Sequence, residues 1–396
     1  MPTSFQRLEE YEFGHGRGGQ LRIVHVADTH LGYSAYRKVC DEDSAFKGLN
    51  QREVDTYRSF EAFVDQVLEL RPDAVLHSGD LFDAVRPSNR ALSFALEQLV
   101  RLSEADIPVV LIAGNHSTPR IRETGSAFRL FEHLPGIYPV YRGAYERIDL
   151  GDLAVHAIPH TDGESFKEQL PCISRSGGAR YEVAMLHAGV VGFKEFRMNE
   201  FNEQIVDSCY LRDEMDYIAL GHYHQHYDVA PNAAYSGSTE RFSFAESGQA
   251  KGFLEVDLAS GTRKFMELPA RPMIDLGPID ARRLDATSLR AEIESHLDRD
   301  LEGKIVRLVV KNLPRMTYEA LDFRGLKELA AGAVHFEPRF EIEREKISIQ
   351  AGAATINSLE HEFVSFLQRY PIEGVDKDSI RKQGLKYLKR GLEESD

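Results

Sequence analysis

Cysteine is scarce in this chain of 396 residues, which has only Cys40, Cys172 and Cys209. The three are scattered, odd in number and without the spacing of metal ligands, so they predict neither a disulfide framework nor a cysteine-based metal site. Such usage is typical of a reducing, cytoplasmic environment. The sequence also lacks an apolar stretch long enough to span a bilayer, and it does not start with the charged-then-apolar order of a signal peptide. We therefore expect no membrane association.

A basic excess is also missing, because 48 Lys and Arg residues stand against 63 Asp and Glu residues, a net charge of −15. This balance counts against broad, non-specific binding of nucleic acid, which favours a basic surface. A nucleic-acid enzyme is not excluded, since bound cations supply positive charge locally. A local basic stripe is also compatible with an acidic whole. The candidates for phosphate contact, each equally well explained as solvated surface, are Arg37, Arg86, Lys194 and Arg241.

Five short apolar runs end directly on polar residues of the metal-binding type. The runs are rich in β-formers and have no helical period, which indicates buried strands. In sheets of such strands functional residues gather at the carboxyl ends, so we expect all five clusters to meet at one edge of one sheet. The runs cover residues 22–27, 74–79, 109–114, 183–186 and 217–221, and they lead into Asp28, His30, Asp80, Asn115, His116, His187, His222 and His224.

This mixed set of oxygen and nitrogen donors suits Mn²⁺, Fe or Zn²⁺ better than Ca²⁺. There are too many donors for one ion, and the two oxygens of Asp80 could bridge two. Residues two apart on an extended segment project to the same side, as Asp28 and His30 would. Two ions roughly 3.5–4 Å apart clamp the attacking and leaving oxygens of a phosphoryl displacement. Taken singly, each position is more often a turn or structural residue, and only the joint pattern favours a two-metal site.

The ordered motifs 28–30, 79–83, 114–116, His187 and 221–224 resemble those of calcineurin-like metallophosphoesterases. Flanking segments narrow the likeness. Residues 30–33, 81–88 and 235–241 resemble the SbcD-type nuclease subunit of the double-strand-break repair nuclease–ATPase complex, in its archaeal-like form. The specific likeness covers roughly residues 20–250.

The resemblance implies an α/β fold, a sandwich of β-sheets flanked by helices, with a small α/β capping domain and a helical C-terminal tail. It assigns the catalytic role to His116, near the leaving group. It also implies two divalent cations, most readily Mn²⁺. One would be held by Asp28, His30, Asp80 and His224, and the other by Asp80, Asn115, His187 and His222.

Three residues depart from the family pattern. Ser117 stands where an acidic residue is common, which puts in doubt the orientation of His116 but not metal binding. Asp83 occupies a position where some relatives carry His, and Ser236 replaces a common Pro; we expect the latter to be tolerated.

Along the chain we expect a flexible leader (1–20), a two-metal domain (21–268), a capping domain (269–350) and a helical tail (351–396). Apolar residues recur at three- and four-residue steps within 57–68 and 92–100, which predicts helices covering the sheet. The resemblance adds that these helices pair two protomers in a homodimer. The capping segment alternates helix-like 289–297 and 321–331 with strand-like 305–310 and 339–342.

One helical face of the tail is apolar, with Phe363 and Leu367 at its centre. Such a face either folds back on the body or docks on a partner. The resemblance favours docking on an SMC-like coiled-coil ATPase subunit.

The function that we predict is two-metal hydrolysis of DNA phosphodiester bonds in double-strand-break repair. The protein would be a nucleoid-associated exonuclease and endonuclease. The alternatives are a calcineurin-like phosphatase or phosphodiesterase acting on a small substrate, and a non-catalytic scaffold. Scaffolds lose metal ligands, and here none is missing. The remaining histidines near the motifs are expected to be structural: His25, His77, His156, His160 and His226.

Overall fold

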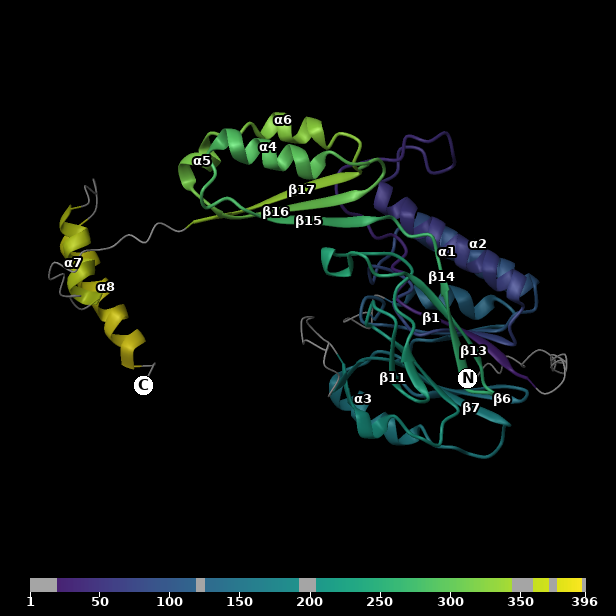
Figure 1. Ribbon diagram of the computed structural model, residues 1–396. Coiled ribbons are helices and arrows are strands. Elements are labelled where there is room, and N and C mark those ends of the chain that lie inside the picture. The colour runs from purple at the N-terminus through teal and green to yellow at the C-terminus, as the bar shows by residue number, and fades with distance from the viewer. Residues whose placement is uncertain (1–19, 119–124, 192–203, 344–358, 370–375, 394–396) are drawn as a thin grey trace. The chain divides into compact units, whose positions relative to one another are not determined.

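The computed structural model describes residues 20–118, 125–191, 204–343, 359–369 and 376–393 (Figure 1). The chain forms two compact units, Met1–Ile342 and Glu343–Asp396. The predicted leader, apart from Gln20, and Lys194 lie outside the described residues. Among the helices described, none is both long and apolar enough to cross a membrane.

Two six-stranded sheets lie at the centre of the first unit. In the first, β1 to β4 are parallel to one another and β13 and β14 are antiparallel additions at one edge. Its spatial order is β14 (Thr262–Glu267), β13 (Gly252–Asp257), β1 (Arg22–Val26), β2 (Ala74–His77), β3 (Val109–Ile112) and β4 (Ile137–Val140). The second sheet is also parallel at its centre and has the order β11 (Tyr227–Ala230), β12 (Ala233–Tyr235), β10 (Tyr217–Gly221), β7 (Tyr181–His187), β6 (Leu153–Ile158) and β5 (Glu146–Leu150).

The expectation of a single sheet is therefore wrong, because β1, β2 and β3 belong to one sheet and β7 and β10 to the other. All five strands are buried on both faces, so apolar content alone cannot reveal which strands pair. The sandwich of sheets flanked by helices is confirmed.

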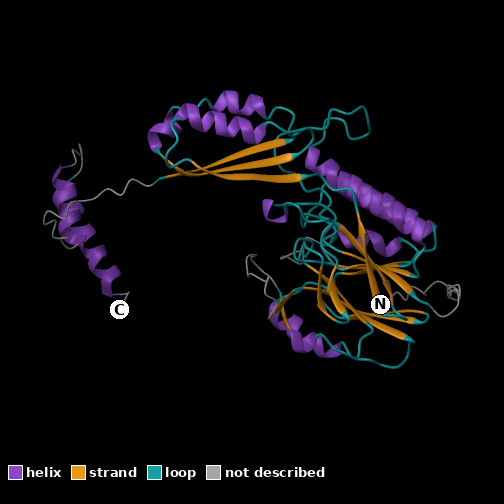
Figure 2. Cartoon of the chain, viewed as in Figure 1, coloured by secondary structure: helices purple, strands orange, loops and turns teal. Residues whose placement is uncertain are grey.

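Alternate side chains of each strand enter different apolar layers. In β1, Ile23 faces the second sheet, where it packs in a cluster with Val183 and Met185. Its neighbour Val24 faces the helices and packs with Phe60 and the residues around it. On the outer face of the second sheet, a further apolar cluster includes Leu186 and Leu220 of the sheet and Phe166 outside it. Helices, sheet, sheet and helix thus form stacked layers, visible in Figure 2.

The helices over the first sheet are α1 (Gln51–Leu70) and α2 (Asn89–Glu104), at the places that the periodicity predicts. The Asn50 side chain caps the start of α1 by accepting a hydrogen bond from the backbone N–H of Arg52. The Ser88 side chain caps α2 by accepting from the backbone N–H of Ala91. On the second sheet lies α3 (Gly163–Gln169). The body is completed by β8 (Gly189–Val191), β9 (Ile205–Asp207), η3 (Ala127–His133), η4 (Leu170–Cys172), η5 (Ser208–Tyr210) and η6 (Phe244–Glu246).

The remainder of the first unit, here called the cap, is a small parallel sheet covered by helices on one face (Figure 1). Its core includes Leu289, Ile293 and Leu308. The strand β15 is not predicted from the sequence, because a Gly–Pro pair such as Gly277–Pro278 usually marks a turn or the end of a strand. The elements are β15 (Met273–Asp280), α4 (Ala286–Leu297), β16 (Ile305–Leu313), α5 (Arg315–Glu319), α6 (Phe323–Leu329) and β17 (His335–Ile342).

A buried ion-pair network joins the cap to helix α1. Arg271, at the start of the cap, donates from Nε and Nη2 to the two carboxylate oxygens of Asp55 at 2.6 and 2.5 Å. Arg52 donates to the same carboxylate at 2.5 Å and lies 3.5 Å from Glu240. Removing either partner of a buried ion pair is strongly destabilising, because it leaves the other charge buried and unpaired. The network therefore holds the start of the cap at Arg271 against helix α1.

The second unit consists of α7 (Leu359–Arg369) and α8 (Lys377–Glu393). The ring of Phe363 lies against Gly384, where a Cβ atom would come within 2.2 Å of it. Leu367 is buried as well. The apolar face predicted for docking is therefore used, at Phe363, to pair the two helices. Among the side chains described in this unit, the large apolar ones that remain exposed are Phe366, at 58%, and Tyr387, at 72%.

Candidate metal centre

The polar residues predicted to bind metal follow the carboxyl ends of strands from both sheets. The segments that follow β1 and β2 continue side by side in the same direction. Asp28 donates its backbone N–H to Gly79 O, and His30 donates to Asp80 O, both at 3.0 Å. From the second sheet, the backbone N–H of His222 lies 3.1 Å from each carboxylate oxygen of Asp28. The motifs therefore meet at one edge of the sandwich, with ligands from each sheet.

Four of these residues have left-handed backbone conformations. The φ angles are 54° for Asp28, 45° for His30, 52° for Asp80 and 95° for His222. Non-glycine residues rarely adopt this region, and those that do cluster at functional sites. The segment 28–30 is thus not extended as the sequence suggested, and its turned backbone is what directs both side chains into the site.

Glycines allow the two sheets to approach closely at this edge. A Cβ atom on Gly221 would lie 1.9 Å from the carbonyl oxygen of Ser78 in the other sheet. A Cβ atom on Gly79 would lie 2.1 Å from Nδ1 of His187. Any larger residue at either position would push the ligands apart.

Asp28, His30 and His224 form the first cluster, with one donor atom of each within 4.8 Å of the others. The Nε2 atoms of the two histidines are 3.2 Å apart. The opposite nitrogens face carboxylates: Nδ1 of His224 is 3.2 Å from Glu246, and Nδ1 of His30 is 3.5 Å from Asp83. At His224 the hydrogen bond of Nδ1 with the Glu246 carboxylate fixes the tautomer that leaves Nε2 free for a cation, the usual arrangement of metal-binding histidine.

Asp28, Asp80 and His187 form the second cluster. Nε2 of His187 is 3.2 Å from Asp80 and 2.9 Å from the Asn115 side-chain oxygen, while its Nδ1 faces the carbonyl oxygen of Ser78 at 2.9 Å. The ring of His222 lies 5.2 Å from that of His187. Once more an anchored Nδ1 leaves Nε2 directed into the site, so the donor set fits a divalent cation.

The carboxylate shared by both clusters is that of Asp28, whereas the resemblance gives the bridging role to Asp80. In the structure Asp80 is engaged by His187 and accepts the backbone N–H of His116 at 3.0 Å. Bridging by Asp80 therefore stays a prediction, and Asp28 is a second candidate for it.

The buried pair of Asp80 and His187 is strongly polarised. Burial alone would lower the pKa of the His187 imidazole, but the charge of Asp80 outweighs burial and raises that pKa to about 9. Burial likewise opposes ionisation of Asp80, but the charge of His187 prevails and holds its pKa far below the usual range. The two shifts favour a protonated His187 facing an ionised Asp80.

His116 forms a third potential metal-binding group with His30 and Asp83, with one donor atom of each within 4.8 Å of the others. Its ring lies 4.9 Å from that of His30 and perpendicular to it. Nδ1 of His116 is 2.9 Å from the backbone carbonyl of Asp83. Asp83 thus orients His116 through its backbone carbonyl, while its carboxylate lies 3.5 Å from Nδ1 of His30. The doubt raised by Ser117 is met in this way, because a backbone carbonyl holds the ring without an acidic neighbour; the Ser117 hydroxyl is buried and has no hydrogen-bond partner among the described residues.

Sequence reasoning missed Glu246 and Lys251. The Lys251 amino group donates to Glu246 at 2.5 Å, and Glu246 in turn faces His224. Burial opposes the charge of Glu246, but the hydrogen bond with His224 and the nearby cations lower its pKa to about 2. Neither residue follows a strand or belongs to a motif. The only signal available was their nearness to the 235–241 segment.

The five histidines expected to be structural belong to none of the potential metal-binding groups found among the described residues. Most are engaged within the protein: His25 with Tyr217, His77 with Thr29, His156 with Tyr145 and Glu182, and His226 with the carbonyl of Tyr235.

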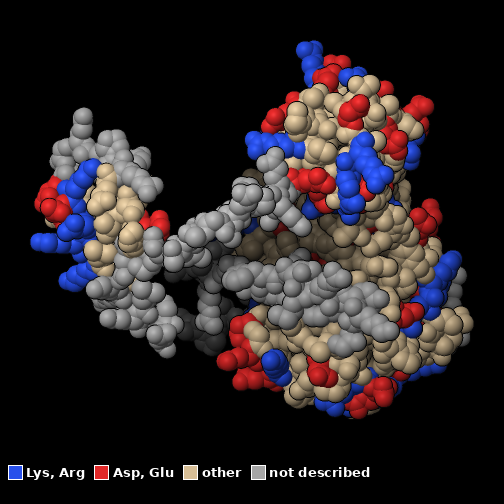
Figure 3. Space-filling model, turned by 60° about the vertical axis from the view of Figure 1, so that its left-hand side comes forward, with Lys and Arg blue, Asp and Glu red and all other residues tan. Residues whose placement is uncertain are grey.

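The candidates for DNA contact differ in their surroundings. Arg37 and Arg86 are exposed. Arg241 instead donates from its guanidinium to the carbonyl oxygens of Gln249, Ala270 and Arg271, so it holds the chain at the start of the cap. On the face seen in Figure 3, basic and acidic side chains are interspersed.

Comparisons with known proteins agree with this geometry. The family model for calcineurin-like phosphoesterases matches residues 21–226. Among curated relatives named "DNA double-strand break repair protein Mre11", that of Methanococcus maripaludis is 31% identical over 60% of this chain and 63% of its own length. The relative from Methanocaldococcus jannaschii is 27% identical over 92% of this chain and 91% of its own, and that from Thermoplasma acidophilum is 28% identical over 76% of each. The chain spans just under two thirds of the first of these and most of the second. It belongs to the calcineurin-like phosphoesterase family.

Proposed function

We propose that this protein is a DNA double-strand-break repair nuclease that hydrolyses phosphodiester bonds with two divalent cations, Mn²⁺ in the first instance. The observation that carries the proposal is the convergence of His30, His187 and His224. All three direct Nε2 into one carboxylate-lined site, and Nδ1 is anchored in His187 by the carbonyl of Ser78 and in His224 by Glu246. The relatives named for break repair supply the substrate class.

Bound cations of this kind polarise a phosphoryl group and lower the pKa of water, so no protein nucleophile is required. The residues of the chain supply the rest. Asp28 and Asp80 provide the anionic charge that retains the cations, with Asn115 and His222 completing the sets that the family pattern implies. His116, held by Asp83, is the residue for proton transfer to the leaving oxygen or for stabilising charge there.

DNA is favoured over a small phosphoester by the cap, which is joined to the body by a buried ion-pair network and which a small-substrate enzyme would not need. Arg37 and Arg86 are the exposed basic residues proposed to contact phosphates of the duplex, together with Lys194. Contacts of this kind position the nucleic acid without reading its sequence. Exonuclease and endonuclease activity on duplex ends and single strands would both use the one metal centre.

Partners and location are part of the same proposal. We infer that the paired helices α7 and α8 dock on an SMC-like coiled-coil ATPase through Phe366 and Tyr387, which are exposed. Helices α1 and α2 would pair two protomers, and the half-exposed Leu96 lies on the second of them. Such an enzyme would act in the cytoplasm, next to the nucleoid.

The test is digestion of end-labelled duplex DNA by the purified full chain, with Mn²⁺, with Mg²⁺ and with a chelator, beside a small chromogenic phosphodiester. We expect Mn²⁺-dependent cleavage of DNA that is lost in His187→Ala. A matched substitution on α4, His296→Ala, should cleave normally, since His296 belongs to no potential metal group of the described chain. Rapid turnover of the small ester without cleavage of DNA would instead favour a phosphatase or phosphodiesterase with a small substrate.

A further inference from the structure

The imidazole of His224 is held by a pair of residues that lie behind it. Glu246 accepts at Nδ1 of His224, and Lys251 binds the other oxygen of that carboxylate. Lys251 also donates to the backbone carbonyl of His224 at 2.9 Å and to the hydroxyl of Ser238 at 3.0 Å. The buried ammonium group of Lys251 therefore binds both the main chain of His224 and the carboxylate that orients its side chain.

Burying two charged side chains costs free energy of folding. The Lys251 side chain is completely buried, and Glu246 is 9% exposed. Charges taken out of water at this depth persist only when each finds a partner, and a pair of apolar residues of similar volume is often as stable. A structural role alone thus gives little reason for this pair, whereas orientation of a metal-binding histidine does.

Helix η6, which carries Glu246, also contacts the cap. Phe244 packs with Met273 of β15 and Ile305 of β16. The guanidinium of Arg307, on β16, lies over the Phe244 ring at 4.5 Å from its centroid. Next to the helix, the hydroxyl of Ser247 donates to the carbonyl of Met273 at 2.8 Å. The three-residue helix is therefore set between a metal-binding histidine and two strands of the cap.

We propose that Glu246 and Lys251 are positioning residues for His224, and that the cap keeps them in place through η6. The inference rests on the proposed use of two cations at this centre. In this arrangement a displacement of the cap is passed to one cation site through Phe244 and Glu246, while the site around His187, which is anchored on Ser78, is left undisturbed.

The test is Mn²⁺ binding to the full chain, measured by titration calorimetry and by counting bound ions after dialysis. In Glu246→Gln we expect one of the two ions to bind about 10- to 100-fold more weakly, the range found when such supporting contacts are removed. The second ion should bind as in the wild type. Thermal denaturation of the metal-free variant shows whether it is folded.

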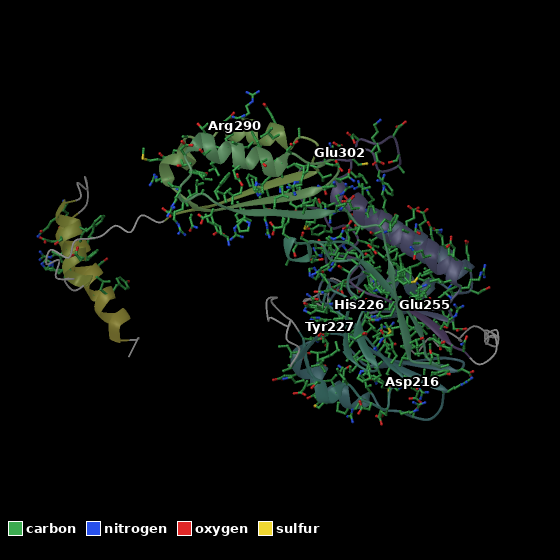
Figure 4. All side chains as sticks on the ribbon, in the orientation of Figure 1. Asp216, His226, Tyr227, Glu255, Arg290 and Glu302 are labelled. Carbon is green, nitrogen blue, oxygen red and sulfur yellow. The ribbon has the colours of Figure 1, made fainter. Side chains whose placement is uncertain are left out.

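Arg307→Met gives a second variant that does not touch the centre. It should weaken the same ion, by a smaller factor. Matched controls are Glu302→Gln and Arg290→Met, both labelled on the cap in Figure 4, and both should bind Mn²⁺ normally. If the wild type binds two ions and Glu246→Gln binds them equally well, the inference is wrong. If the wild type binds none, the proposed function itself fails.

Discussion

Binding of Mn²⁺ to the metal-free protein should release protons into solution. A cation needs the free electron pair of Nε2, whereas the His187 imidazole carries a proton in the metal-free protein, because Asp80 raises its pKa to about 9. The pKa of His224 is raised as well, since its contact with Glu246 outweighs its burial. Cation and proton therefore compete for the same nitrogens.

The size of the effect follows from the pKa of His187. At pH 7.5 a group with a pKa of about 9 is protonated in a ratio of roughly 30 to one, so loading the centre releases about one proton from His187. Below about pH 9 the apparent affinity should fall by roughly tenfold for each unit decrease in pH, for each proton displaced. The contribution of His187 should fall as the pH rises towards 9, because His187 then becomes neutral.

Calorimetry in buffers of different ionisation enthalpy measures the number of protons released. At pH 7.5 the apparent binding enthalpy should change with the buffer, with a slope of about one proton more in the wild type than in His187→Ala. A slope of zero at pH 7.5 would refute the reasoning, because it would mean that His187 is neutral beside Asp80 or that it does not bind the cation.

Three further results are expected. Asp80→Ala should lose at least one of the two ions and all measurable turnover; two retained ions, counted after dialysis, would instead assign the bridging role to Asp28. His116→Ala should keep both ions and lose about 10²–10⁴-fold in rate, as expected for a lost acid–base group, and an equal loss of metal in the dialysis count would make His116 a ligand. Replacing Phe366 and Tyr387 together by Asp should abolish co-purification with the coiled-coil ATPase while the isolated subunit still cleaves DNA; retained co-purification would exclude this surface.

The sequence reveals the strands, and the places of the polar residues that follow them, for a simple physical reason. Strands buried on both faces are apolar throughout, and in a parallel sheet the polar residue that follows such a strand lies at the edge where ligands gather. The apolar runs alone therefore place Asp28 and Asp80 correctly with respect to β1 and β2. The helices α1 and α2 can be predicted equally well, because apolar residues recur along one face of each helix.

What the sequence cannot show depends on contacts between distant segments. The division into two sheets follows from strand pairing, which apolar content does not encode. Glu246 ends the short helix η6 and Lys251 directly precedes β13, and only the fold brings them behind His224. Phe363 has the pattern of a residue available for a partner, but it packs on Gly384 of the neighbouring helix. In each case the deciding information is a partner residue, not a local pattern.

The origin of the ligands in two sheets has a consequence for the order of folding events. Asp28 and His222, which are 194 residues apart in the chain, meet only when both sheets have docked. A nascent or partly folded chain with one sheet formed would hold too few donors to retain a cation. Metal should therefore enter late and contribute little to the folding transition state, so that saturating Mn²⁺ slows unfolding of the chain while leaving its refolding rate nearly unchanged.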